Sequence, residues 1–172
     1  MKQYQVNRAC HEAGHAFIAV AEEPNLSLLE VSIRPSFGPG FIITGGGTKI
    51  SSEEETDNYN VLISKIKHKL AGYLAEKIIL GKVSPGSDID FKEAWLLSCR
   101  YLQMKYPERK INPDDPPEKN KEACALLERL MEDTAKIVKD HRSEIKTIAE
   151  KLLEKKTLSG KEVREIIKNA SR

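Results

Sequence analysis

The stretch CHEAGHAFIAV, residues 10–20, says more about this chain than any other of its length. It places His11, Glu12 and His15 in an H-E-x-x-H arrangement that runs into apolar residues. On an α-helix, residues four apart lie on one face, about 6 Å apart along the axis, so the two imidazoles can share a metal ion. Glu12 is then close enough to reach a metal-bound water. The stretch therefore predicts a helix with a zinc site, where zinc activates a water and the carboxylate takes its proton.

A random arrangement of the same residues seldom produces this pattern. With 4 histidines and 26 acidic residues among 172 positions, a shuffled chain contains His-acid-x-x-His in about one case in a hundred. The apolar run that follows strengthens the interpretation, because imidazole and carboxylate groups in apolar surroundings need polar partners. We therefore favour a metal site over an accidental spacing.

The third protein ligand is not decided by spacing. A catalytic zinc ion has three protein ligands and one open position. The metzincin class of zinc proteases places a histidine where this chain has Ala21. The acidic candidates are Glu76 in LAEKIIL, and Asp88 and Asp90 in PGSDIDF. Zinc is the expected ion for such donors, although two imidazoles and a carboxylate also bind other divalent metals.

The other histidines and the cysteines are not expected to bind metal. His68 lies between two lysines, which indicates a solvated side chain, and His141 lies at a predicted helix junction, which indicates a structural one. Cys10, Cys99 and Cys124 are odd in number and have no C-x-x-C spacing. They predict no disulfide framework and favour a reducing compartment.

Composition indicates a soluble, helix-rich globular protein, with 40% hydrophobic and 31% charged residues. A net charge of +2 gives no reason to expect nucleic acid or an anionic membrane as a partner. No apolar run approaches the ~20 residues of a membrane span. We expect a cytoplasmic protein without a membrane span, unless the chain is cut from a longer protein.

The first helix and strand follow from periodicity. Residues 4–22 have a helical pattern that ends before Pro24, because proline cannot continue a helix. LLEVSIRP, residues 28–35, alternates with a period of two, which predicts a half-buried strand. The residues predicted to share its buried face are Leu29, Val31 and Ile33.

The residues after this strand predict a turn, a strand and a loop. FGPGFIITGGG, residues 37–47, contains a Gly/Pro turn followed by a short strand at 41–44. The three glycines at 45–47 then predict a mobile loop. Beyond them, Ser52 and Glu55 form a possible capping box for the next helix.

Most of the remaining chain is predicted to be helical. A stripe of apolar residues four apart predicts a helix down to Leu80, closed by Gly81; the stripe is Leu62, Ile66, Leu70, Leu74 and Ile78. A third helix, which Ser87 can cap, is predicted to reach about Tyr106. Two more follow at 118–141 and 142–155.

A last helix is expected after a capping box formed by Ser159 and Glu162. The predicted fold is therefore mainly α (α+β), with a small β-hairpin or sheet after the H-E-x-x-H helix. We expect a single domain over 1–172, with a zinc-binding half at 1–106 and a helical half at 118–172. The proline-rich stretch 107–117 is expected to link them.

Four stretches in order resemble the peptidase domain of the FtsH family, the membrane-anchored ATP-dependent zinc proteases (peptidase family M41). They are CHEAGHAF, VSIRP with its continuation FGPGFIIT, LAGYLAEKIILGKVSPGSDIDFKEA, and AEKLLEKKTLSGKEVREII. The resemblance implies that Asp90 is the third zinc ligand and that Glu76 orients an imidazole from the second shell of the site. It also implies that Glu12 is the general base of a zinc metalloendopeptidase.

The resemblance further implies how substrate is bound. In this family an extended substrate lies against a sheet edge, which here points to the backbone of Val31, Ser32 and Ile33. The expected partners are an unfolded polypeptide or peptide substrate and, by resemblance to a ring-forming family, further copies of the chain in a homo-oligomer, a hexamer in that family.

The chain also departs from the family. It has no Walker A motif and no transmembrane segment, so we expect it to lack its own ATPase motor. Tyr73 stands where the family has an arginine, and the segment before 107–117 is shortened. The alternative to a protease is therefore a catalytically weak or inactive zinc-stabilised module for interaction or oligomerisation.

Overall fold

The computed structural model describes residues 3–37, 43–44, 46–51, 58–85 and 87–170. Its elements in chain order are α1 (Gln3–Ala21), β1 (Ser27–Ser32), β2 (Ser36–Phe37), β3 (Ile43–Thr44), β4 (Gly47–Ser51), α2 (Tyr59–Ala75), the π-helical turn η1 (Glu76–Leu80), α3 (Ser87–Lys105), the 3-10 turn η2 (Pro117–Lys119), α4 (Lys121–Asp140), α5 (Arg142–Lys155), β5 (Thr157–Ser159) and α6 (Gly160–Ala170). The predicted mainly α (α+β) fold with a small sheet is confirmed.

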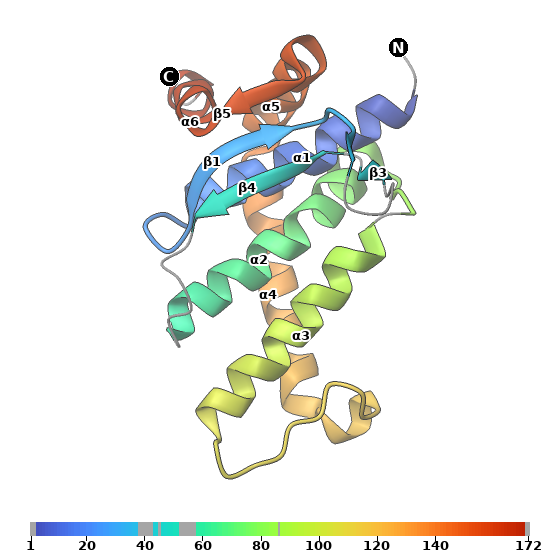
Figure 1. The fold of residues 1–172 in the computed structure, drawn as a ribbon, viewed down its shortest axis with the longest axis vertical. Helices are drawn as coiled ribbons and strands as arrows, with labels where there is room; N and C mark the ends of the chain where they lie inside the picture. The colour runs from blue at the N-terminus through green and yellow to red at the C-terminus, as the bar shows by residue number, and fades with distance from the viewer. Residues whose placement is uncertain (1–2, 38–42, 45, 52–57, 86, 171–172) are drawn as a thin grey trace.

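Helix α1 is the central element. It contacts α2, α5, α6 and the sheet strands β1 and β4. Figure 1 shows the sheet lying across α1, with α2, α3 and α4 extending away from it as an elongated bundle. Small residues on α1 allow this crowding. A Cβ atom at Gly14 would lie 2.6 Å from the carbonyl oxygen of Ala71 and 2.7 Å from Cβ of Ala75, so the backbones of α1 and α2 meet at glycine.

The three-stranded sheet has the order β4-β1-β5, and β1 is antiparallel to both neighbours. Val31 at its centre lies opposite Thr48 on one side and Leu158 on the other. Neither outer strand was predicted. The prediction of a glycine loop at 45–47 is wrong at Gly47, because this residue begins β4. Strands this short carry too little periodicity to recognise, and they form because β1 provides partners.

The predicted alternation of the first strand is wrong at Leu29. Leu29 is 55% exposed, whereas its neighbour Leu28 is 2% exposed and lies in the core with Val31 and Ile33. The cause is a register shift between Leu28 and Glu30 in the pairing with β4. A bulge adds one residue to a strand, so the side chains before it point to the opposite faces from those that strict alternation predicts.

The predicted helix ends are largely confirmed. The helix that begins at Tyr59 runs through η1 to Leu80, and Gly81 follows it with a φ of 70°, as a C-terminal glycine should. Before α6, the amide of Ser159 donates to Oε2 of Glu162 at 2.9 Å, and the amide of Glu162 donates to Oγ of Ser159 at 3.3 Å. This capping box is as predicted.

Two further expectations fall partly or wholly on residues that are not described. The capping box of Ser52 and Glu55 lies outside the described residues, and Asn58 caps α2, accepting a hydrogen bond from the amide of Asn60 at 2.9 Å. Of the strand predicted at 41–44, the described part is β3, which pairs with β2.

The segment 107–117 is held against the helices on either side of it. Trp95 Nε1 donates to the carbonyl oxygen of Pro113 at 3.0 Å, and Asn120 Nδ2 donates to that of Asn112 at 2.8 Å. The main core contains residues from all six helices α1–α6. In the described part of the chain, no helix is both long and apolar enough to cross a lipid bilayer.

We expect the substitution Gly14→Ala to destabilise the protein. Alanine is the better helix former by about 1 kcal/mol, but its Cβ collides with the backbone of α2, and overpacking of this kind costs about 1–3 kcal/mol. Urea unfolding followed by circular dichroism should show a lower free energy of unfolding. Gly47→Ala is the control, because no atom lies within 4 Å of a Cβ there. A stability equal to or above that of the wild type would contradict the close crossing.

Candidate metal centre

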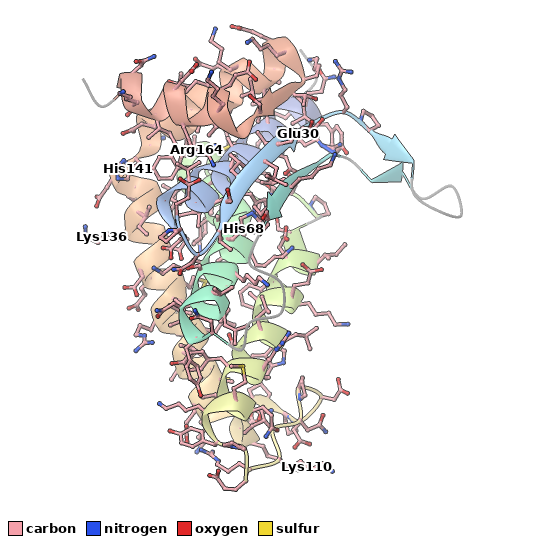
Figure 2. All side chains as sticks on the ribbon, turned by 60° about the vertical axis from the view of Figure 1, so that its left-hand side comes forward. Glu30, His68, Lys110, Lys136, His141 and Arg164 are labelled. Atoms are coloured by element: carbon pink, nitrogen blue, oxygen red, sulfur yellow. The ribbon has the colours of Figure 1, made fainter. Side chains whose placement is uncertain are left out.

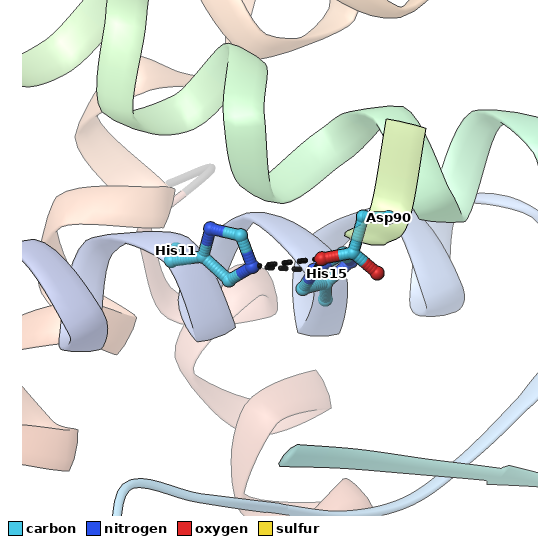
Figure 3. Close-up of side chains that lie close together, drawn as sticks. All are labelled: His11, His15 and Asp90. Carbon is cyan, nitrogen blue, oxygen red and sulfur yellow. Dashed lines mark hydrogen bonds and ion pairs between the residues drawn. The ribbon is translucent and has the colours of Figure 1, made fainter. Parts of the chain in front are cut away.

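Two imidazoles from α1 and one carboxylate from the first turn of α3 converge on one point (Figure 3). His11 Nε2 and His15 Nε2 are 3.0 Å apart, and Oδ2 of Asp90 lies 3.1 Å from the first and 3.3 Å from the second. Among the described residues, this is the one group of three side chains of metal-binding type whose ligand atoms lie within 4.8 Å of one another.

The other nitrogen of each imidazole is already engaged. His15 Nδ1 lies 2.6 Å from the carbonyl oxygen of His68, which can only accept a hydrogen bond, so Nδ1 carries the proton. His11 Nδ1 lies 2.7 Å from Oε1 of Glu76 and donates to that carboxylate. In the neutral rings both Nε2 atoms therefore present lone pairs to each other and to Asp90. Three acceptors facing one another require a cation or a proton between them.

The same contacts shift the pKa values of His11 and Asp90. Burial opposes a charge on His11, but its hydrogen bonds with Asp90 and Glu76 raise the pKa of this imidazole to about 9. Burial likewise opposes ionisation of Asp90, but the hydrogen bond from His11 and the adjacent imidazole of His15 hold the pKa of this carboxyl well below its ordinary value. Without a metal, a proton on His11 Nε2 separates the acceptors, because it can be donated in a hydrogen bond to Asp90.

Glu12 lies beside the cluster on α1 and is buried. The hydroxyl of Thr48, in β4, donates to its Oε2 at 3.0 Å. Sequence reasoning missed Thr48, because it belongs to no motif and its contact with Glu12 exists only once β4 packs on α1. The arrangement is two imidazoles and a carboxylate around a cation position, with a second carboxylate held next to it.

A scan against protein-family models matches residues 2–106 to the family described as Peptidase family M41. The chain belongs to peptidase family M41. It is 30% identical to the ATP-dependent zinc metalloprotease FtsH of Opitutus terrae, over 92% of this chain and 28% of that protein. The corresponding protein of Marinobacter nauticus is 27% identical, over 94% and 29%. Human ATP-dependent zinc metalloprotease YME1L1 is 28% identical, over 92% and 22%. The M41 chain thus spans less than a third of the length of these relatives.

The three acidic candidates take different positions in this M41 domain. Asp90 joins the two imidazoles. Glu76 contacts His11 from the opposite side, at Nδ1, and is fully buried. Asp88 is exposed and lines a groove of about 540 Å³ between α3 and α4. Only Asp90 therefore faces the point where both Nε2 atoms meet.

Glu76 is held by several donors, as a buried carboxylate must be. Its Oε2 accepts from the amide of Ser84 at 2.6 Å and its Oε1 from the hydroxyl of Ser87 at 3.4 Å. Burial opposes its charge, but the hydrogen bonds from His11 and Ser84 lower its pKa. Glu76 is also the first residue of the π-helical turn η1, and such turns are frequent at functional sites.

His68 was predicted to be solvated, and that prediction is wrong. The side chain comes from α2 (Figure 2), is 4% exposed, and its ring centroid lies 4.8 Å from that of His15. Helical periodicity explains the error, since position 68 shares a face of α2 with Gly72, which lies against the imidazoles of α1. Burial and the charge of His15 hold the pKa of His68 well below its ordinary value.

His141 is not part of the cluster and lies at the junction of α4 and α5 (Figure 2), where its ring packs 4.9 Å from that of Phe17. Its Nδ1 lies 3.1 Å from Oε1 of Glu144. The structure thus places it in the role that was predicted for it, as a packing and hydrogen-bonding residue.

The expected substrate strand is also wrong in its position. Residues 31–33 belong to or follow β1, the central strand, which pairs with β4 on one side and β5 on the other. Beyond that pairing, the amide of Ile33 donates to the carbonyl oxygen of Lys156 at 2.9 Å. In the described part of the chain the sheet edge beside Glu12 is β4, whose second side has no strand partner.

Gly72 of α2 passes directly over the two imidazoles. A Cβ atom at this position would lie 2.5 Å from His15 Nε2 and 2.6 Å from His11 Nε2. The M41 domain can bring α2 this close to the cluster only because the residue has no side chain.

Gly72→Ala is therefore expected to abolish metal binding, because its methyl group must displace both ligand nitrogens. Purified variant and wild type, loaded with one equivalent of zinc and desalted, should differ in metal content by plasma emission spectrometry. Gly47→Ala, on the sheet, should bind as the wild type does. A Gly72→Ala variant with full zinc content would show that the imidazoles lie elsewhere.

Proposed function

We propose that this chain is a zinc-dependent metalloendopeptidase that hydrolyses peptide bonds of unfolded proteins or peptides. One observation carries the proposal: Nε2 of His11, Nε2 of His15 and Oδ2 of Asp90 form a set of acceptors that suits a metal cation, and the buried Glu12 lies next to it. Membership of peptidase family M41 supports it, as does the description of the relatives as zinc metalloproteases.

The residues present fit a zinc ion. Both imidazoles have a proton on Nδ1, held there by Glu76 and by the carbonyl oxygen of His68, and so offer Nε2 as ligand. Asp90 supplies an ionised oxygen. Zinc held by these three residues would polarise the scissile carbonyl and lower the pKa of a bound water to about 7.

Glu12 has the role of general base in this proposal. It takes the proton of the attacking water and passes it to the leaving amine. Its carboxylate can do this reproducibly only if it is held in one orientation. The hydrogen bond from Thr48 to Oε2 provides that constraint and links the base to strand β4.

We further propose that substrate binds along β4. Within the described residues, the outer edge of Gly47–Ser51 has no strand partner, and it offers backbone donors and acceptors beside the carboxylate of Glu12. An extended peptide can add to such an edge as a further strand. A folded protein has its strands already paired, so the substrate class is an unfolded segment or a peptide.

Delivery by an ATPase and assembly into a hexameric homo-oligomer are properties proposed by relation to the longer relatives. The division into a zinc-binding half at 1–106, a linker at 107–117 and a helical half at 118–172 stays a prediction.

Glu12→Gln should reduce the cleavage of fluorescently labelled casein by about 10²–10⁴-fold, with zinc content unchanged, because glutamine cannot accept the proton of the water. Glu150→Gln, at an exposed glutamate of α5, is the matched control. If wild type with one zinc per chain leaves casein intact and Glu12→Gln behaves no differently, the chain is a zinc-stabilised interaction module instead.

Zinc binding should release about one proton per ion near pH 7.5, because the metal needs neutral imidazoles. The pKa of His11 rises from 6.5 to about 9 in the fold, so the proton stabilises the metal-free protein fully below pH 6.5 and this contribution is lost as the pH rises through about 9. Apparent zinc affinity should accordingly increase up to about pH 9 and then level off. Titration calorimetry in two buffers of different ionisation enthalpy measures the protons released. An affinity independent of pH between 7 and 9 would contradict this.

A further inference from the structure

We propose that Lys69 is a positioning residue for Asp90, holding its Oδ1 so that Oδ2 alone is presented to the two imidazoles; this inference rests on the proposed zinc site. Lys69 lies on α2 and belongs to none of the motifs that identify the family.

The two oxygens of Asp90 have different surroundings. Oδ2 lies 3.1 Å from His11 Nε2 and 3.3 Å from His15 Nε2, whereas Oδ1 lies 3.5 Å from Nζ of Lys69. Figure 3 shows the carboxylate with one oxygen directed at the imidazoles and the other directed away from them. In this orientation Oδ2 is the oxygen available to a metal, and Oδ1 is the oxygen that contacts the ammonium group of Lys69.

Lys69 is itself fixed in place. Its Nζ also forms an ion pair with Glu93, which is on α3 like Asp90 but one turn later. The side chains of Lys69 and Glu93 line a cavity of about 460 Å³ together with Lys65, His68 and apolar residues. Burial opposes the charge on Lys69, but its hydrogen bond to Glu93 and the charge of Asp90 raise its pKa. The ammonium group thus bridges two carboxylates of α3 from α2.

This contact matters because a carboxylate can bind a metal through one oxygen or through both. Ligand carboxylates are oriented by the hydrogen bonds of their remaining lone pairs, and loss of such a partner typically costs 10–100-fold in metal affinity or activity. A catalytic site also needs an open coordination position. By holding Oδ1, Lys69 would leave Oδ2 as the single oxygen that Asp90 offers to a bound metal.

Charge and orientation must be separated in the test. Removing Lys69 alone deletes a positive charge next to a cation site, which by itself favours zinc. The double substitution Lys69→Met with Glu93→Gln removes an ion pair and leaves the net charge unchanged. Lys69→Arg keeps a cation that can reach both carboxylates. Lys65→Met, one turn earlier on α2 and lining the same cavity, is the control for loss of a lysine.

Zinc affinity is measured by chelator competition, and site geometry by the visible spectrum of the Co²⁺-loaded proteins. We expect the double variant to bind zinc about tenfold or more weakly and to have an altered Co²⁺ spectrum. Lys69→Arg and Lys65→Met should match the wild type. The thermal midpoints of all metal-free proteins, by circular dichroism, should agree, because the pair is partly exposed.

Zinc affinity and Co²⁺ spectrum of the double variant equal to those of the wild type would overturn the inference. The inference would also be overturned if Lys69→Arg lost as much zinc affinity as the double variant. The same holds if the double variant's loss of affinity came with a comparable fall in the thermal midpoint of the metal-free protein. If the wild type itself binds no zinc, the proposed function fails instead, so the two failures are distinguishable.

Discussion

The close crossing of α1 and α2 is the constraint on which the rest of this structure depends. Gly14 allows the backbones to meet at Ala71 and Ala75, and Gly72 lets α2 pass over the imidazoles of α1. Only at this separation can the carbonyl oxygen of His68 reach Nδ1 of His15 at 2.6 Å. A bulkier residue at either glycine would move α2 outward and remove the partner that sets the tautomer of the ring.

His11, His15 and Glu12 are each oriented by a hydrogen bond to a residue from another element of the fold. Glu76 orients His11, the backbone of α2 orients His15, and Thr48 orients Glu12. Buried polar groups are tolerated because these contacts satisfy them, and a network of this kind is stabilising only when it is complete. Among the described residues, three acceptors also face one another at its centre. A cation between these acceptors would interact favourably with all three, which agrees with the zinc chemistry proposed for the site.

The sheet places this centre beside a backbone edge. Because β1 takes a partner on each side, it is the central strand of the sheet, and β4 is the edge at which we propose that a peptide binds. The same strand contributes Thr48, so the edge and the proposed base are mechanically linked.

Much of this was present in local sequence. The H-E-x-x-H spacing lies within one helix, and the apolar stripe down to Leu80 lies within another. Both helices were therefore predictable from residues a few positions apart. The choice of Asp90 over Glu76 and Asp88 came from family resemblance and not from spacing, since it depends on how α3 packs. Four features had no such signal: the bulge at Leu29, the burial of His68, the strand β4 and the contact between Lys69 and Asp90. Sequence alone determined which residues can bind a metal, because helical geometry is local; the tertiary structure decided which of them meet, because hydrogen bonds and strand pairing between distant segments exist only after packing.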